Sequence, residues 1–238
     1  MRNTEIKNKI NDFYKEYCKF ANITNPAQMS INFINQINPY VELNEIPSFN
    51  INPNLFKLND NKIRPTVYHE FTHVNDYATY CLNETIPSRR LIMLLYTEIH
   101  ATIIEMKTAT KFDNINDKKL LTYDYQMNDI NGTITISKYV EKFDTIFGKS
   151  IDQFQENKTK SNFINFIKNL GYAIGIKAFC EKYVDYSVIQ NNLIKAIRIF
   201  GSNIIELINI GCQENITEND IIHMANIWGG LMLRICQA

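Results

Sequence analysis

The stretch His69-Glu70-Phe71-Thr72-His73 decides both the expected fold and the expected function of this 238-residue chain. On a helix that turns by about 100° per residue, the two histidines lie one turn apart and only about 40° apart around the axis. Both imidazoles can therefore point at one metal ion. Glu70 lies beside them, where a carboxylate can take a proton from a metal-bound water. The motif predicts a hydrolytic zinc site carried on a helix.

Chance is a poor explanation for this motif, because the chain has only four histidines. A random arrangement of the same residues would contain H-E-x-x-H about 0.004 times. The alternatives are two unrelated core histidines at 69 and 73, and a surface carboxylate or a non-hydrolysing metal site at Glu70.

The composition indicates a neutral globular protein. Lys and Arg together number 25, as do Asp and Glu, so the net charge is zero. This balance argues against a nucleic-acid partner, whose binding depends on surplus positive charge. No apolar run reaches about 18 residues, so no membrane-spanning helix is expected. A polar start without a signal-peptide core and scattered cysteines without a C-x-x-C pair favour a cytoplasmic protein with reduced thiols.

The apolar periodicity before residue 112 predicts an α+β fold that is mostly helical, with a small antiparallel sheet packed on the metal-site helices. Pro65 suits the first turn of the motif helix, after a loop over 60–64. The expected elements are a helix over 3–20, strands over 30–34, 40–43 and 48–58, and helices over 65–82 and 89–109.

The rest of the chain is expected to be helical. Residues 110–132 are polar and end in an Asn131-Gly132 turn. Helices are expected over 137–147, 161–183, 187–209 and 218–236, the last opened by a Thr217-x-x-Asp220 capping box. Gly171 and Gly175 are best explained by close packing of two helices in the core. Residues 1–112 are expected to form the core that carries the metal site, and residues 133–238 a helical region or a part of the same compact domain.

A third protein ligand is required to complete a zinc site that keeps one position open. Glu98 is the best candidate, because it follows His73 by 25 residues on the next helix. Leucines and the small residue Ala101 share its helix face, so the two helices can pack closely as antiparallel neighbours. Glu105 on the same face is the rival ligand. The alternative for Glu98 is a salt bridge, with Arg64 or Arg89 as its partner.

Other polar residues near the motif have weaker claims. Asp76 lies about 20° from His69 around the helix and is a possible second-shell acceptor for a ligand imidazole, or an ordinary exposed acid. His100 points away from Glu98 on its helix, and His223 lies in an apolar helix, so both are expected to be structural. One of the nearby tyrosines could donate to an oxyanion: Tyr68, Tyr77, Tyr80 or Tyr96.

His69–His73 followed by Glu98-Ile-His-Ala-Thr resembles the zincin metallopeptidases whose third ligand is a glutamate. Among these, residues 30–107 are most similar to the small intracellular and phage-borne peptidases related to the ImmA/IrrE group. The resemblance implies that His69, His73 and Glu98 bind Zn²⁺ and that Glu70 is the general base. It also implies that the strand over 48–58 is the sheet edge that lines the cleft.

The expected function is therefore that of a zinc metallopeptidase that hydrolyses a peptide bond of an intracellular protein or peptide, with Glu70 activating the zinc-bound water. A second hypothesis is a metal-stabilised regulatory module that binds a partner protein without cleaving it. A third is a structural protein without metal. The sequence leaves the substrate and the oligomeric state open.

Overall fold

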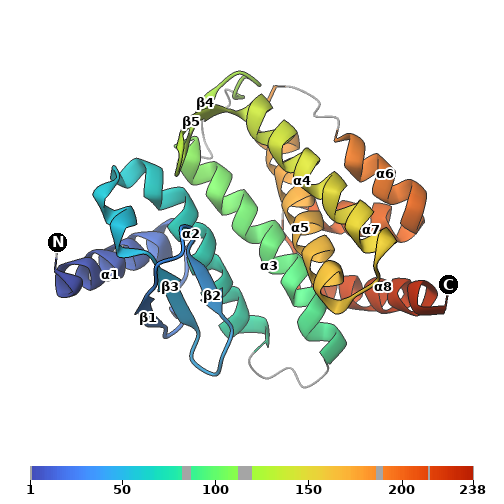
Figure 1. Ribbon diagram of the computed structural model, residues 1–238, viewed down its shortest axis with the longest axis horizontal. Coiled ribbons are helices and arrows are strands. Elements are labelled where there is room, and N and C mark those ends of the chain that lie inside the picture. The colour runs from blue at the N-terminus through green and yellow to red at the C-terminus, as the bar shows by residue number, and fades with distance from the viewer. Residues whose placement is uncertain (1, 82–86, 112–119, 186–189, 214, 238) are drawn as a thin grey trace.

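The computed structural model describes residues 2–81, 87–111, 120–185, 190–213 and 215–237, with the backbone alone at 81, 87–92 and 232–237. Helix α3 lies between an N-terminal part that contains the sheet and a C-terminal part built of helices (Figure 1). The elements before residue 112 are α1 (Asn3–Phe20), β1 (Ser30–Phe33), β2 (Tyr40–Glu42), β3 (Ser48–Ile51), a 3₁₀ turn (Pro53–Lys57), α2 (Asp60–Asp76), a π-helical turn (Tyr77–Cys81) and α3 (Pro87–Ala109).

The N-terminal sheet has the strand order β1-β3-β2. Phe49 and Ile51 of β3 are fully buried. They belong to the apolar core that also contains α1 and α2. The expected α+β class is confirmed: a mostly helical protein with a small sheet and a helical C-terminal half. One detail differs, because β1 pairs with β3 in parallel while β2 pairs with β3 antiparallel, so the sheet is mixed.

Helix α2 begins at Asp60, earlier than Pro65 predicted. The side chain of Asn59 accepts a hydrogen bond from the backbone N–H of Asn61 and so caps the helix. Such a cap satisfies one of the N–H groups left free at a helix start. The loop expected over 60–64 is therefore wrong, and Pro65 lies inside the helix.

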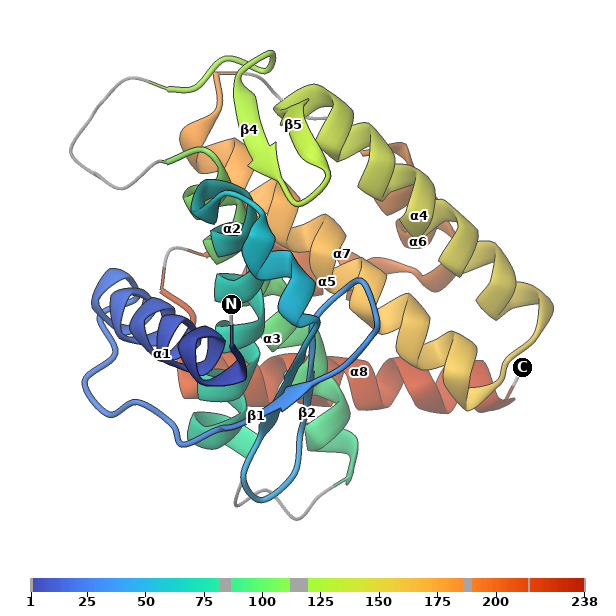
Figure 2. The same cartoon turned by 60° about the vertical axis from the view of Figure 1, so that its left-hand side comes forward.

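The C-terminal half follows a short hairpin that the polar sequence of 110–132 did not predict. Strands β4 and β5 pair antiparallel, and β4 packs beside α2 (Figure 2).

The helix expected over 187–209 is divided at Gly201, whose φ of 81° is readily adopted by glycine. The capping box of Thr217 and Asp220 is confirmed. The elements after residue 120 are β4 (Gln126–Asp129), β5 (Gly132–Thr135), α4 (Ile136–Glu156), α5 (Lys160–Tyr183), α6 (Asn191–Phe200), α7 (Ser202–Gly211) and α8 (Glu218–Gln237).

Helix α3 contributes buried residues to four apolar clusters of the described chain, the two largest among them. Its Ile104 packs with Phe71 of α2 and the sheet residues. Its Leu95 and Ile99 pack with the aromatic residues of α4 and α5, Phe166 among them. The division between 1–112 and 133–238 stays a prediction, and residues 112–119 lie outside the described part of the chain.

Within the described residues, none of the helices combines the length and the apolar character that a membrane crossing demands. Cys18, Cys180 and Cys212 are free thiols. Burial raises the pKa of Cys180 and of Cys212 to about 12, which makes both poor nucleophiles. The side chains of Cys81 and Cys236 lie outside the described residues.

Candidate metal centre

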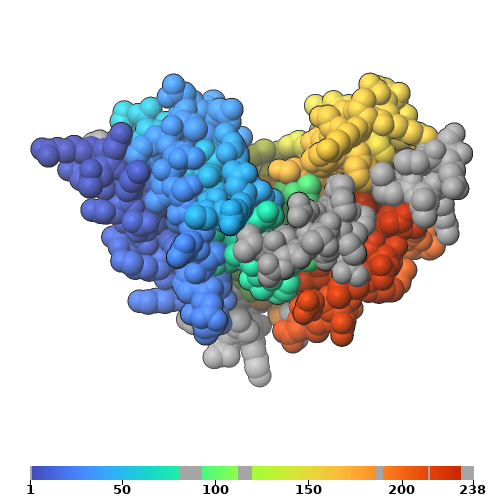
Figure 3. All heavy atoms as spheres, turned by 90° about the horizontal axis from the view of Figure 1, so that it is seen from below, coloured from blue at the N-terminus to red at the C-terminus, as the bar shows by residue number. Residues whose placement is uncertain are grey.

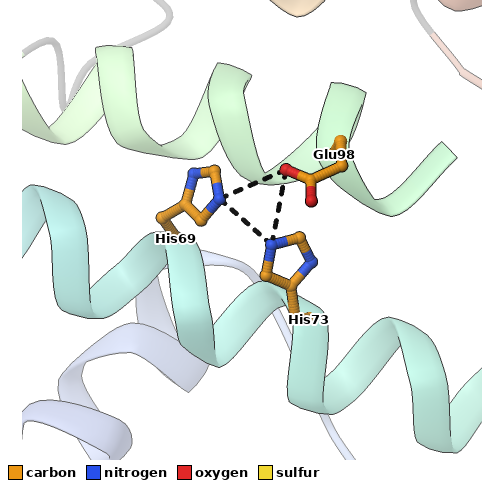
Figure 4. A group of neighbouring side chains, drawn as sticks. All are labelled: His69, His73 and Glu98. Carbon is orange, nitrogen blue, oxygen red and sulfur yellow. Dashed lines mark hydrogen bonds and ion pairs between the residues drawn. The ribbon is translucent and has the colours of Figure 1, made fainter. Parts of the chain in front are cut away.

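His69, His73 and Glu98 form a buried cluster that could hold a metal ion (Figure 4). Nε2 of His69 lies 3.0 Å from Nε2 of His73, because α2 places the two residues one turn apart. Oε2 of Glu98, from α3, lies 3.6 Å from each of these nitrogens. The structure thus brings together the three residues that the sequence singled out as ligands.

The spacing and the hydrogen bonding of this cluster fit a small cation. Four ligands arranged tetrahedrally at about 2.1 Å from an ion are roughly 3.4 Å apart, which lies within the range of 3.0–3.6 Å seen here. Oε2 of Glu98 is buried and has no hydrogen-bond partner in the described structure. A buried carboxylate oxygen without a hydrogen bond is costly. A cation bound between the three side chains would remove this cost.

The outer nitrogens of both imidazoles have polar neighbours. Nδ1 of His73 lies 2.9 Å from Oγ1 of Thr97. Nδ1 of His69 lies 2.9 Å from Oε2 of Glu105, whose other oxygen accepts a hydrogen bond from the hydroxyl of Tyr139. Histidines that bind metals commonly have such partners, which fix the ring orientation and the tautomer. Glu105, the rival ligand in the sequence, thus lies on the far side of the His69 ring from the cluster.

Asp76 does not lie against a ligand imidazole as expected. Its Oδ2 lies 3.0 Å from Nδ1 of His100. Asp76 shares the helix face of His69, but it is seven residues beyond His69 and therefore about 10 Å further along the axis. The same contact turns His100 away from the metal cluster, in agreement with its expected structural role.

Glu98 does not pair with Arg64, its suggested salt-bridge partner. Arg64 contacts Glu16 instead, at 3.0 Å. Oε1 of Glu98 lies 3.5 Å from Nζ of Lys168 on α5. The side chain of Arg89 lies outside the described residues.

His223 contacts Glu206 at 2.8 Å on the exposed side of α8, as a structural histidine would.

The two buried histidines differ in charge before any cation binds. Burial alone would lower the pKa of His69, but the carboxylates of Glu105 and Glu98 outweigh it and raise the pKa to about 10. Burial lowers the pKa of His73 to about 3. These opposite shifts favour a charged His69 and a neutral His73 at neutral pH, so that Nε2 of His69 can donate to Nε2 of His73.

Glu70 lines a cavity of about 240 Å³ beside the cluster. Burial raises the pKa of this carboxyl to about 7, against the opposing charge of His69. A carboxylate with a pKa near neutrality can both accept and return a proton. The cavity lies between β2 and α5, where Figure 3 shows the molecule hollowed between the blue N-terminal part and the yellow start of α5.

Helix α5 contributes a residue that the sequence did not indicate. The ring of Tyr172 stacks on that of His69, with centroids 5.2 Å apart and 17° between the planes. Its hydroxyl lies 3.1 Å from Nε2 of His69. The tyrosines considered from the sequence lie elsewhere: Tyr68 in the N-terminal core, and Tyr77, Tyr80 and Tyr96 around a small cluster with Met93 and Ile221. No local pattern relates Tyr172 to His69, since the two are 103 residues apart.

Comparison with models of protein families, with curated proteins and with solved structures finds no match for this chain. Its chemistry is therefore inferred from the cluster and the cavity themselves.

Proposed function

We propose that this protein is a zinc metallopeptidase that hydrolyses peptide bonds of an intracellular protein or peptide. The observation that carries the proposal is the buried His69–His73–Glu98 cluster, which lies with Glu70 on a cavity of about 240 Å³. Two imidazoles and one carboxylate form a ligand set found in catalytic zinc sites, which keep one position for water or substrate. The free cysteines among the described residues support a reducing compartment.

Zinc, when bound, would polarise the peptide carbonyl and lower the pKa of water towards about 7. Glu70 takes one proton from the attacking water as its oxygen forms a bond to the carbonyl carbon. Glu70 then gives this proton to the amine nitrogen as the carbon–nitrogen bond breaks. Glu105 and Thr97 hold the two imidazoles in orientation throughout.

Strand β2 is the edge that supports an extended substrate. The sequence favoured the strand over 48–58, but β3 occupies the centre of the sheet, with β1 on one side and β2 on the other. β2 has only one partner strand in the described sheet, and its residues Tyr40 and Val41 line the cavity. A peptide can add to such an edge through main-chain hydrogen bonds, with alternate side chains directed into the cavity.

The test compares the wild type with Glu70→Gln, both loaded with zinc and incubated with casein and a mixed peptide library. We expect about one zinc per chain in both proteins, and cleavage by the wild type alone. Equal cleavage by Glu70→Gln would exclude Glu70 as the base. Zinc binding without any cleavage by the wild type would contradict the peptidase and favour the module that binds a partner without cutting it.

A further inference from the structure

The wall of the cavity opposite β2 is one face of α5. Four of its polar residues line the cavity at the helical spacing i, i+3, i+4 and i+7: Asn165, Lys168, Asn169 and Tyr172. The helical half of the chain thus completes the cleft whose other side is formed by the sheet. Among these four residues, only Tyr172 has a polar atom within hydrogen-bond distance of a histidine of the cluster, according to the described contacts.

The ring of Tyr172 has two stacking partners. Phe143 of α4 stacks on it with centroids 4.9 Å apart and 11° between the planes. His69 is the second stacking partner. Such offset or parallel contacts between aromatic rings are stabilising beyond the area that they bury. The hydroxyl therefore has a fixed position beside Nε2 of His69, at 3.1 Å.

Metal binding would change what this hydroxyl can contact. Without a cation, Nε2 of His69 is a hydrogen-bonding partner for the phenol. A nitrogen that binds a cation has neither a free lone pair nor a proton to offer, so the hydroxyl loses this partner. A group that enters the cavity next to the cluster is an alternative partner within its reach, because Tyr172 lines that cavity. A phenol O–H is a good donor to an oxygen that gains negative charge.

We propose that Tyr172 is a catalytic residue that donates a hydrogen bond to the carbonyl oxygen of the scissile peptide as that oxygen becomes an oxyanion. This inference rests on the proposed peptidase function and supplies the donor that the sequence did not identify. Lys168 is a weaker candidate, because its side chain is half exposed and its Nζ lies 3.5 Å from Oε1 of Glu98.

The test uses the full-length, zinc-loaded protein and the variant Tyr172→Phe, which keeps the stacked ring and removes the hydroxyl. The probe is an acetylated and amidated Leu-Leu phosphinic pseudodipeptide, whose tetrahedral phosphinate imitates the oxyanion. Leucine suits the aliphatic side chains of the cavity, Val41, Leu43 and Leu94. Zinc affinity is measured by competition with a chelator and probe affinity by calorimetry.

In Tyr172→Phe we expect unchanged zinc affinity and a dissociation constant for the phosphinate at least about tenfold higher, with kcat on a cleaved peptide lower by about 10²- to 10³-fold. The matched control is Tyr125→Phe, which also loses a hydroxyl and its hydrogen bond, here to the carbonyl of Thr110. Tyr125 does not line the cavity, so this variant should bind the probe as the wild type does. Thermal unfolding of both variants verifies that they fold.

Three outcomes overturn the proposal. The first is a tenfold or larger loss of zinc affinity in Tyr172→Phe, which would make the phenol a metal ligand. The second is unchanged phosphinate affinity in Tyr172→Phe, or a loss in Lys168→Met alone. The third is a zinc-loaded wild type that does not bind the phosphinate. The peptidase function is judged by cleavage and by Glu70→Gln, so a failure of the Tyr172 proposal is distinguished from a failure of the peptidase function on which it rests.

Discussion

Gly171 of α5 lies directly against Glu98 of α3. A Cβ atom added to Gly171 would lie 2.5 Å from Cβ of Glu98, which no packed side chain tolerates. One turn later, a Cβ at Gly175 would lie 2.7 Å from the carbonyl oxygen of Ile99. The two glycines therefore let the backbones of α3 and α5 meet, as their spacing predicted. This close approach brings Tyr172 and Lys168 to the metal cluster.

Substitution Gly171→Ala should disturb the metal centre through this contact. The added methyl group must displace Glu98 or separate the two helices, which costs about 1–3 kcal/mol of unfolding free energy. Zinc affinity should fall as well, because Glu98 moves relative to the histidines. Urea unfolding and chelator competition measure the two effects.

The matched control for this prediction is Gly230→Ala. Nothing lies within 4 Å of a Cβ built at this position of α8, and alanine is a better helix former than glycine by about 1 kcal/mol. Gly230→Ala should therefore keep or increase stability. A Gly171→Ala protein with wild-type stability and zinc affinity would contradict the role assigned to the close approach.

Glu105 should tune zinc affinity without being a ligand. Substitution Glu105→Gln keeps the size of the side chain but removes the charge beside Nδ1 of His69. Loss of such an outer partner costs about 10- to 100-fold in metal affinity. Glu98→Ala should lose much more, because it removes a ligand. If Glu105→Gln abolishes zinc binding while Glu98→Ala retains it, the third ligand has been assigned to the wrong residue.

Zinc binding should release about one proton at pH 7.5. The pKa of His69 is raised to about 10 in the metal-free protein, so this ring is protonated and must lose its proton to bind a cation. His73 has a pKa of about 3 and releases none. The affinity for zinc should therefore fall about tenfold per pH unit between pH 9 and pH 7.5. Calorimetry in buffers with different ionisation enthalpies counts the protons, and a count near zero would contradict the assigned charge of His69.

The Asp76–His100 pair should affect stability but not zinc affinity. Burial alone would lower the pKa of His100, but Asp76 outweighs it and raises the pKa above the ordinary value, which is about 6.5. The pair therefore stabilises the fold fully below about pH 6.5 and loses this contribution as the pH rises through the raised pKa. His100 is 35% exposed, so the effect should be small, on the order of 0.5–1 kcal/mol.

Asp76→Asn tests this pair. In the metal-free proteins, the wild type should have the higher unfolding free energy, and its advantage over Asp76→Asn should be larger at pH 5.5 than at pH 9. Zinc affinity should be the same in the wild type and in Asp76→Asn. A tenfold weaker affinity in Asp76→Asn would instead support the second-shell role that the sequence suggested. A stability difference that grows towards pH 9 would contradict the direction of the His100 shift.

The parts of the site predicted correctly are those set by short separations along the chain. His69 and His73 share a helix, and Glu98 lies on the next helix after a short connection, so helical spacing and antiparallel packing were sufficient to bring them together. The start of α2 was placed too late because Pro65 was assigned to the first turn and the cap at Asn59 was not recognised. The edge strand was misassigned because the strand order β1-β3-β2 differs from the order along the chain.

The sequence by itself determined which residue types meet in the cluster and in what kind of fold: two imidazoles and a carboxylate from two helices, a neighbouring glutamate, and a mostly helical chain to carry them. Tertiary structure alone decided that Glu105 rather than Asp76 lies against His69, that β2 forms the wall of the cavity, and that Tyr172 reaches the cluster. A helical wheel gives the direction of a side chain around its own axis. It does not give the position along the axis at which two helices make contact, nor which helix from a distant part of the sequence packs against them. In this protein the close approach of α3 and α5 decides both.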